Sequence, residues 1–475
     1  MSTNSGARGV VAAVDLGATS GRVMLGHVGP DLLRLEQVHR FPNGPVERED
    51  GLRWDVTGLF RSVLDGLRAA APAAPLSIGV DSWAVDYALL ADGRMLHEPF
   101  HYRDSRTERG VDVVHRVVPF ARLYPQNGLQ FLPFNTLYQL AADGPRLSGA
   151  ESALLIPDLF AHWLSGARVA EVTNASTTGL LSVGGGWNDD LIARLGYPRK
   201  IFPPLVEPGA PLGTLLPPIA AQTGLSTHTR VTAVGSHDTA SAVVAVPLTG
   251  PNAAWISCGT WGLVGLELER PVLTEASRTA NFTNEGGVDG RIRFLHNVMG
   301  LWLLSESVRS WELQSGDTID LQRLLAQSAA IREPMPIFDV EDPCFLAPGD
   351  LPARIADVLT EQGKPVPRSK PELVRSILES LADAFARAVH TASRLANTPV
   401  DLIHIVGGGS LNALLCQLTA DRSGLPVLAG PVEATAIGNV LVQARAAGLL
   451  SGDLEVLRAL VAHSFQPVRY EPRSR

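Results

Sequence analysis

The sequence has few cysteines, no cluster of basic residues and no long apolar run. Its three cysteines, Cys258, Cys344 and Cys416, are scattered without metal-ligand spacing, which argues against a zinc site or a disulfide framework and favours a reducing compartment. The formal net charge is −8 and no Lys/Arg run occurs, so nucleic acid and anionic membranes are not expected as partners. No apolar run approaches the ~20 residues that a membrane helix needs.

The start of the chain lacks a charged segment followed by a signal-length apolar stretch, and residues 1–8 are expected to form a loose tail. A cytoplasmic enzyme is therefore expected. A composition of 45% apolar and 19% charged residues is typical of a globular protein. At 475 residues the chain exceeds one ordinary core, which predicts two domains.

What the sequence does contain is a glycine hairpin at the start of each half. Residues 11–26 and residues 254–268 each consist of an apolar run, a turn of glycine with small hydroxyl residues, and a second apolar run. Such a turn brings backbone N–H groups and hydroxyls against an anion. One copy is weak evidence, but two copies half a chain apart predict a nucleotide-handling enzyme with two similar lobes.

Strand-like and helix-like segments alternate along both halves, which predicts an α/β fold with sheets covered by helices. The segment 247–252, with two prolines and a glycine, is the best linker and divides the chain into lobes of residues 1–247 and 248–475. Residues 124–218 are expected to form a cap or a substrate-shaping insertion. The expected strands are 10–16, 22–28, 76–80, 87–90, 231–234 and 402–406, and the expected helices are 56–70, 157–165, 300–311, 373–396, 411–423 and 434–447, followed by a short tail.

Asp15 ends the first apolar strand, just before the glycine turn. A buried ionised carboxylate needs hydrogen bonds or a cation, so Asp15 is interpreted as a Mg²⁺ anchor that acts through water. The alternative is an aspartate that only caps the turn through its own backbone. The next residues, Ala18, Thr19, Ser20 and Gly21, are small enough for a phosphate to approach the backbone, and Arg22 could neutralise its charge.

A second candidate carboxylate, Asp238, lies where a strand gives way to a helix in the segment 235–240. The simple interpretation is helix capping by Ser236 or Asp238. A carboxylate at a helix N-terminus is also held ionised by the helix dipole and can accept a proton from a substrate hydroxyl. We therefore interpret Asp238 as a general base, with His237 contacting the substrate or orienting its neighbour.

Two further patterns suggest ligand contacts. The triglycine 407–409 joins a strand to a helix and lets backbone approach a ring or a phosphate, although it could be only a tight turn. Asp81, Trp83 and Asp86, together with residues 102–106, mix aromatic and hydrogen-bonding side chains as sugar sites do. The alternative is a salt-bridged surface strand with a core tryptophan.

At this point the motifs identify a family resemblance that spans nearly the whole chain. The sequence resembles the FGGY carbohydrate kinases, and the matching motifs follow in that family's order. They are residues 13–24, 54–55, 81–83, 102–107, 128–140, 236–243, 259–261, 284–287, 297–304, 404–409, 430–434 and 437–439.

The resemblance implies an actin/hexokinase-like, ribonuclease H-like fold of two duplicated lobes with ATP and a ketose in the interlobe cleft. Residues 1–247 would form the lobe with the sugar site, a phosphate hairpin and the catalytic base, and residues 248–475 the nucleotide-binding lobe. The implied partners are a small ketose and MgATP, with the protein a monomer or weak homodimer. The stretches 128–140 and 297–304 point to the branch that phosphorylates L-rhamnulose at O1.

Carried over by position, the resemblance implies roles for individual residues. Asp238 would be the base that accepts the proton of the attacking hydroxyl. His237, Thr239 and Asn297 fall where the family binds the ketose. The positions implied to contact ATP are Ala18, Thr19, Ser20, Gly21, Arg22, Thr260 and Gly408.

Two positions depart from the closest pattern. Ala84 stands where that pattern has a glycine that contacts the sugar, and Ser305 stands where a longer glutamine contacts the nucleotide. Sugar preference is therefore the open point, and L-fuculose or D-xylulose are the alternative substrates. A non-enzymatic member of the fold, either a filament protein or a sugar-sensing repressor, is the alternative of a different class.

Overall fold

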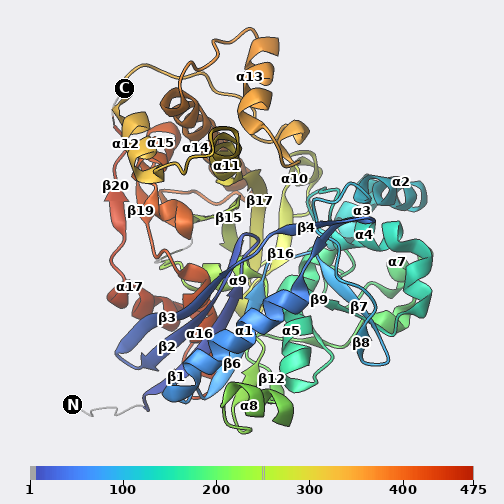
Figure 1. The fold of residues 1–475 in the computed structure, drawn as a ribbon. Coiled ribbons are helices and arrows are strands. Elements are labelled where there is room, and N and C mark those ends of the chain that lie inside the picture. Colours follow the sequence, from blue (N-terminus) through green and yellow to red (C-terminus); the bar gives the residue numbers. More distant parts are fainter. Residues whose placement is uncertain (1–6, 249, 251, 474–475) are drawn as a thin grey trace. The chain divides into compact units, whose positions relative to one another are not determined.

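The computed structural model describes residues 7–248, 250 and 252–473 (Figure 1). The chain forms two compact units: the first comprises Met1–Thr249, Glu267–Phe294 and Ala434–Phe465, and the second Gly250–Leu266, Leu295–Glu433 and Gln466–Arg475. None of the described helices is both long and apolar enough to cross a membrane. Thr249 and Pro251 of the predicted linker, and most of the predicted N-terminal tail, lie outside the described residues.

The first unit is built on a six-stranded sheet in the order β12-β13-β6-β1-β2-β3. Its centre is the predicted hairpin, in which β1 and β2 are antiparallel, while β1, β6 and β13 run parallel. β1 is a near-continuous apolar run and all residues of β6 are buried, as is typical of parallel strands covered on both sides. The strands of this sheet are β1 Gly9–Leu16, β2 Ser20–Gly29, β3 Leu32–Pro42, β6 Ser77–Ser82, β12 Pro211–Thr214 and β13 Arg230–Thr232.

Helices α1 (Val56–Ala70) and α16 (Ala434–Ala446) cover opposite faces of this sheet. Gly66 of α1 lies against Val23, whereas Val440 of α16 lies against Gly26, three residues further along β2. Because side chains alternate between the faces of a strand, positions 23 and 26 point to opposite sides. Asp55 begins α1 as predicted, with its side chain accepting a hydrogen bond from the N–H of Gly58.

The rest of the first unit consists of short elements around a second apolar cluster. Residues 124–218, predicted as an irregular cap or insertion, contribute Leu137, Tyr138, Leu180, Leu191 and Phe202 to this cluster. The remaining elements are β4 Pro45–Arg48, β5 Gly51–Trp54, β7 Tyr87–Ala91, β8 Arg94–Met95, α2 Thr107–Val117, α3 Phe120–Asn127, α4 Thr136–Asp143, β9 Ser152–Leu155, α5 Ile156–Ser165, β10 Ala170–Glu171, α6 Val172–Ala175, α7 Asp189–Arg194, β11 Leu205–Val206, α8 Pro217–Thr223, α9 Asp238–Val244, α10 Glu275–Thr279, β16 Thr283–Gly286 and α17 Leu454–Ser464.

The second large sheet has seven strands, in the order β20-β19-β18-β14-β15-β17-β16. Its first six strands repeat the order of the first sheet, β12-β13-β6-β1-β2-β3, and β16 is added at the edge. Again the hairpin β14–β15 is antiparallel, and β14, β18 and β19 run parallel. The elements are β14 Ala253–Cys258, β15 Trp261–Leu268, β17 Ile292–Met299, α11 Trp302–Ser315, α12 Leu321–Ala330, α13 Leu351–Glu361, α14 Lys370–Ala396, β18 Leu402–Val406, α15 Ala413–Ser423, β19 Val427–Ala429 and β20 Val468–Tyr470.

Three features differ from the expectations. The C-terminal tail is not irregular, because it holds α17, whose Leu457 and Val461 are buried, and the edge strand β20. Strand β3 was not predicted because only two of its eleven residues are buried and its apolar and polar residues do not alternate regularly. Residues of the predicted second lobe pack in the first unit, since Gln443 of α16 donates to the carbonyl of Ala12 and Asn439 to that of Gly79.

Candidate active site

Three carboxylates lie where β1 and β6 end and α9 begins. Asp15 and Asp81 are partners in the parallel pairing of β1 with β6. The N–H of Ser82 donates to the carbonyl of Ser236 at 2.9 Å, which fixes the loop before Asp238 against the end of β6. The carboxyl ends of parallel strands meet at one sheet edge, and open α/β sheets bind ligands there. The structure thus brings Asp15 and Asp238, two predicted site residues that are far apart in the sequence, to the same edge of the sheet.

Asp15 is buried, and its Oδ2 lies 2.8 Å from both Nε and Nη2 of Arg22. The turn after it is closed by its own backbone, since the N–H of Gly17 donates to the carbonyl of Ser20 at 3.0 Å. The turn therefore does not depend on the side chain of Asp15, which is paired with Arg22 instead of capping the turn. The predicted ATP-binding residues, Ala18 to Arg22, form this turn and the start of β2.

Asp81 was predicted for the sugar cluster, but it is fully buried beside Asp15. Its Oδ2 accepts a hydrogen bond of 2.6 Å from Nδ2 of Asn439, and among the described residues no donor reaches its Oδ1. Burial first, and then the charge of Asp15, raise the pKa of Asp81 well above its usual range. A bare carboxylate oxygen beside a second carboxylate is an environment that favours a cation.

This carboxylate set fits a hydrated Mg²⁺ rather than a directly ligated ion. No group of three or more His, Cys, Asp or Glu side chains with the geometry of a metal cage occurs in the part of the chain that the structure describes. Mg²⁺ commonly keeps several waters and uses only one or two protein carboxylates. Asp15, with Asp81 behind it, is therefore able to hold the ion through water.

Asp238 is the first residue of α9, and its side chain is 32% exposed. Its Oδ1 accepts a hydrogen bond from Thr239 at 3.0 Å and lies 3.4 Å from Nε2 of His237. Burial raises the pKa of Asp238, His237 opposes this effect, and the charge of Asp15 adds to it. A carboxylate that is accessible yet held at a helix start has the properties of a general base.

Ser236, one of the two residues considered for capping α9, does not cap this helix. His237 occupies the position before α9 without a side-chain capping bond. The hydroxyl of Ser236 turns away from the helix and donates to Oε2 of Glu171 at 2.6 Å, as does its backbone N–H at 3.0 Å. Glu171 is buried and was not identified from the sequence, because its link to residue 236 spans 65 positions.

The turn after β6 carries Ala84 in a strained segment. The next residue, Val85, has φ of 67°, a conformation that a β-branched residue rarely adopts. It is held because the carbonyl of Val85 accepts hydrogen bonds from Thr136 at 2.6 Å and from Gln139 at 3.3 Å. Strain of this kind is retained at sites where the surrounding structure fixes a particular backbone position.

The other members of the predicted sugar cluster belong to the interior. Asp86 accepts hydrogen bonds from the indole N–H groups of Trp54, at 2.6 Å, and Trp83, at 3.1 Å. Burial raises its pKa to about 6. Trp83 is buried, as the alternative of a core tryptophan expects, but Asp86 is buried too and does not belong to a surface strand.

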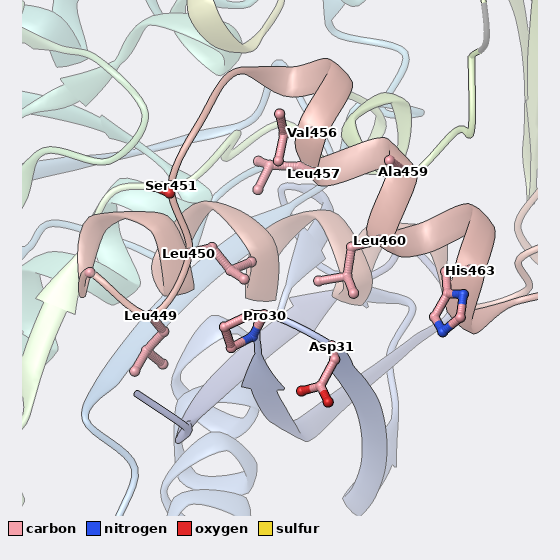
Figure 2. A pocket seen from close by; sticks show the side chains of 11 residues that line it. Pro30, Asp31, Leu449, Leu450, Ser451, Val456, Leu457, Ala459, Leu460 and His463 are labelled. Carbon is pink, nitrogen blue, oxygen red and sulfur yellow. The ribbon is translucent and has the colours of Figure 1, made fainter. Parts of the chain in front are cut away.

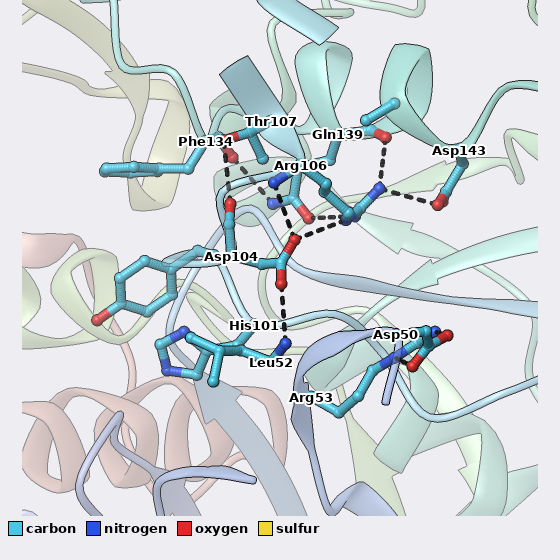
Figure 3. Close-up of polar contacts among 12 residues, drawn as sticks. Asp50, Leu52, Arg53, His101, Asp104, Arg106, Thr107, Phe134, Gln139 and Asp143 are labelled. Atoms are coloured by element: carbon cyan, nitrogen blue, oxygen red, sulfur yellow. Dashed lines mark hydrogen bonds and ion pairs between the residues drawn. The ribbon is translucent and has the colours of Figure 1, made fainter. Parts of the chain in front are cut away.

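Figure 3 shows that the charged residues Asp104 and Arg106 of the 102–106 motif also make hydrogen bonds and ion pairs with other parts of the first unit. Asp104 accepts hydrogen bonds from the N–H of Leu52 at 2.8 Å and of Arg106 at 2.9 Å. The guanidinium of Arg106 donates to Asp143 at 2.8 Å and to the side chain of Gln139 at 3.1 Å. These contacts join the start of α2 to α4 and therefore contribute to the fold.

In the second unit the structure brings three predicted segments together. The N–H groups of Leu301 and Trp302, at the start of α11, donate to the carbonyls of Gly259 and Thr260 in the hairpin turn, at 2.9 and 3.2 Å. The triglycine lies on the other side of this turn, since a Cβ on Gly409 would stand 2.3 Å from Sγ of Cys258. The predicted ATP contacts Thr260 and Gly408 therefore share one neighbourhood.

The two remaining predicted contacts also lie on elements of this unit. Asn297 is half-buried on β17. Ser305 is exposed on α11, and its hydroxyl donates to the carbonyl of Leu301 at 3.0 Å. That bond is the ordinary use of a serine within a helix, so the side chain of Ser305 is engaged with its own helix.

A separate pocket of about 650 Å³ lies in the first unit beside α17 (Figure 2). Leu449, Leu457 and Leu460 line it together with Pro30 and Asp31 of the turn between β2 and β3. It contains none of the predicted site residues and offers few groups with chemical function.

Comparison with known proteins shows the family to which this chain belongs. Residues 10–245 match the N-terminal domain, and residues 254–447 the C-terminal domain, of the FGGY family of carbohydrate kinases. The chain belongs to this family, and it is therefore a sugar kinase that uses ATP as co-substrate. The predicted actin/hexokinase-like fold is confirmed: the xylulose kinase from Lactobacillus acidophilus superposes with a TM-score of 0.77 at 17% identity, over 98% of this chain and 94% of that one.

Particular relatives are more similar in sequence. The rhamnulokinase of Pectobacterium carotovorum subsp. carotovorum (strain PC1) is 43% identical over 474 residues, covering 98% of this chain and 93% of the relative. The rhamnulokinase of Bacteroides thetaiotaomicron is 38% identical over 469 residues, covering 97% and 95%. The family resemblance seen in the sequence is thus confirmed.

Proposed function

We propose that this enzyme transfers the γ-phosphoryl group of ATP to O1 of L-rhamnulose, with Asp238 as the general base. The observation that carries the proposal is the position of Asp238: a part-exposed carboxylate at the start of α9, beside the carboxylates at the ends of β1 and β6. The choice of sugar follows the rhamnulokinase relatives.

In phosphoryl transfer the protein mainly positions the reactants and stabilises charge. Asp238 accepts the proton of the attacking 1-hydroxyl while Oδ1 remains hydrogen-bonded to Thr239. The family resemblance assigns ketose contacts to His237, Thr239 and Asn297, and a backbone contact to Ala84. The strained turn at Val85 sets where that backbone stands.

The family resemblance assigns ATP contacts to residues 18–22, Thr260 and Gly408. It also points to position 305, where the hydroxyl of Ser305 donates within α11. Asp15 holds Mg²⁺ through water, and that ion, when bound, neutralises negative charge on the phosphates. Arg22 offsets the charge of Asp15.

The test is coupled ADP release with MgATP against L-rhamnulose, L-fuculose, D-xylulose, L-ribulose and glycerol. The proposal expects the highest kcat/KM with L-rhamnulose, and a phosphate ester at C1 by ³¹P–¹H correlation of the product. A higher kcat/KM with another sugar would overturn the substrate assignment while leaving the kinase. No ADP release with any of the five would overturn the activity and favour a non-enzymatic member of the fold.

A further inference from the structure

A buried ion pair between Arg293 and Glu285 contacts His237, the residue that precedes the proposed base Asp238. The side chain of Arg293, on β17, is completely buried, and Nη1 lies 3.1 Å from Oε2 of Glu285 on β16. Nε of Arg293 donates to the carbonyl of Gly286 at 2.9 Å. Taking two charges out of water is costly, so a pair in this position is a feature that needs an explanation.

Both members of the pair face the imidazole of His237. Nη2 of Arg293 lies at hydrogen-bond distance, 3.0 Å, from Nδ1, and Oε2 of Glu285 lies 3.3 Å from the same nitrogen. On its other side the ring presents Nε2 to Oδ1 of Asp238 at 3.4 Å. The four side chains therefore form a continuous row that ends at the proposed base.

The direction of the hydrogen bonds along this row follows from the donors available. A guanidinium can only donate, so in its 3.0 Å hydrogen bond with Nη2 of Arg293 the Nδ1 of His237 is the acceptor. Oε2 of Glu285, 3.3 Å from the same nitrogen, makes no hydrogen bond among the described residues. In a neutral imidazole the proton is then on Nε2, the nitrogen that faces Asp238. Although burial by itself would raise it, the charge of Arg293 holds the pKa of Glu285 below its usual range, which keeps a counter-charge beside Arg293.

We propose that Glu285 and Arg293 are positioning residues that fix His237 in the tautomer carrying its proton on Nε2, so that this N–H is directed at Asp238 and orients its carboxylate. Neither residue touches the reactants. The inference rests on the function proposed for Asp238 and adds the device that holds this base in a reactive orientation.

A purely structural ion pair would have no reason to end at an imidazole nitrogen. Arg293 has its backbone anchor in Gly286, and Glu285 supplies its charge partner, so β16 and β17 are linked without His237. The third contact of Arg293, from its Nη2 to Nδ1 of His237, is the one that links the ion pair to the candidate active site.

The experiment replaces the pair as a unit, because removing one member would leave a buried charge without its partner and could unfold the chain. The variant Glu285→Gln/Arg293→Met removes both charges and retains similar volume. Wild-type turnover with the preferred sugar of the panel is measured first, which separates this test from that of the function itself. We expect kcat to fall roughly ten- to a hundredfold, the scale of a mispositioned catalytic group, with KM for ATP and the thermal midpoint little changed.

A second background separates positioning from structural damage. In His237→Gln the amide N–H can occupy the place of Nε2–H without depending on a tautomer. Introducing Glu285→Gln/Arg293→Met into that background should change kcat less than about twofold, a non-additive result typical of coupled residues. An equal fall in both backgrounds would overturn the proposal.

The tautomer itself is measured by ¹⁵N NMR of the histidine-labelled enzyme, with His237 assigned by its absence in His237→Gln. The wild type should show protonated Nε2 and unprotonated Nδ1, and the double variant should show a mixture. A wild type with its proton on Nδ1 would overturn the proposal, as would wild-type kcat in the double variant.

Discussion

Arg22 and Asp15 face each other across the β1–β2 hairpin, with Nε and Nη2 of the guanidinium 2.8 Å from Oδ2 of the carboxylate. The sequence suggested separate tasks for them, an ion anchor and a phosphate ligand. The structure makes them one unit, in which the carboxylate fixes the direction of the guanidinium. A fixed guanidinium binds phosphate with less loss of side-chain entropy.

We predict that Arg22→Met weakens ATP binding roughly tenfold or more, since a hydrogen bond to a charged group contributes about 1.5–3 kcal/mol. The KM for the sugar should change little. The matched control is Arg34→Met, since Arg34 is exposed on β3 and its side chain forms an ion pair with Glu36. Equal effects of the two substitutions on KM for ATP would show that Arg22 has no specific contact with the nucleotide.

Asp238→Asn should lower kcat roughly 10²–10⁴-fold, the usual scale for loss of a general base, with ATP binding retained. Because burial raises the pKa of Asp238, and the base must be ionised, wild-type kcat should fall as pH falls through that raised value. Asp15→Asn is the comparison variant. Its defect should be partly relieved by high Mg²⁺, whereas that of Asp238→Asn should not, and near-native turnover of Asp238→Asn would exclude it as the base.

The elements that could be predicted from sequence are those with strong local patterns. The β1–β2 and β14–β15 hairpins, α1 and β18 match their predictions almost residue for residue because apolar periodicity, glycine turns and Asp55 identify them. The edge strand β3 and the helix α17 lack such signals or depend on packing against distant segments.

The candidate site divides in the same way. Asp15 and Asp238 could be found because each follows a strand beside glycine or a helix start. Glu171, Glu285 and Arg293 could not be given roles, because their contacts with residues 236 and 237 are made across 48 to 65 positions of the chain. Asp104 and Arg106 show that residues typical of a sugar site also occur in a buried network of ion pairs, which the sequence alone does not distinguish.

Asp86 should make stability depend on pH. Its pKa is raised from 3.8 to about 6 in the folded protein, so between these values the folded state binds the proton more strongly. The free energy of unfolding therefore decreases as pH rises through this window, by about 3 kcal/mol in full. Thermal midpoints of the wild type and Asp86→Asn at pH 4.5 and 7 test this. The wild type should lose more on going to pH 7, and a parallel response of the two proteins would show that Asp86 is not the group responsible.

Gly438 provides a test of the packing that places the base. This residue lies in the middle of α16, where it meets α9, and a Cβ on it would stand 1.8 Å from the carbonyl oxygen of Ser241. Backbone cannot rotate away as a side chain can, so Gly438→Ala must push α16 from α9, whose first residue is Asp238.

The sign of the effect of Gly438→Ala is decisive. In an unobstructed helix interior, replacing glycine by alanine stabilises by about 1 kcal/mol. The clash with Ser241 predicts the opposite, a destabilisation of roughly 1–3 kcal/mol, together with a lower kcat because Asp238 moves with α9. Gly184→Ala is the control, since a Cβ there meets nothing within 4 Å, and it should change stability by less than about 0.5 kcal/mol. Denaturant unfolding and kcat of both variants provide the comparison, and a stabilised Gly438→Ala would mean that α9 and α16 are further apart than described.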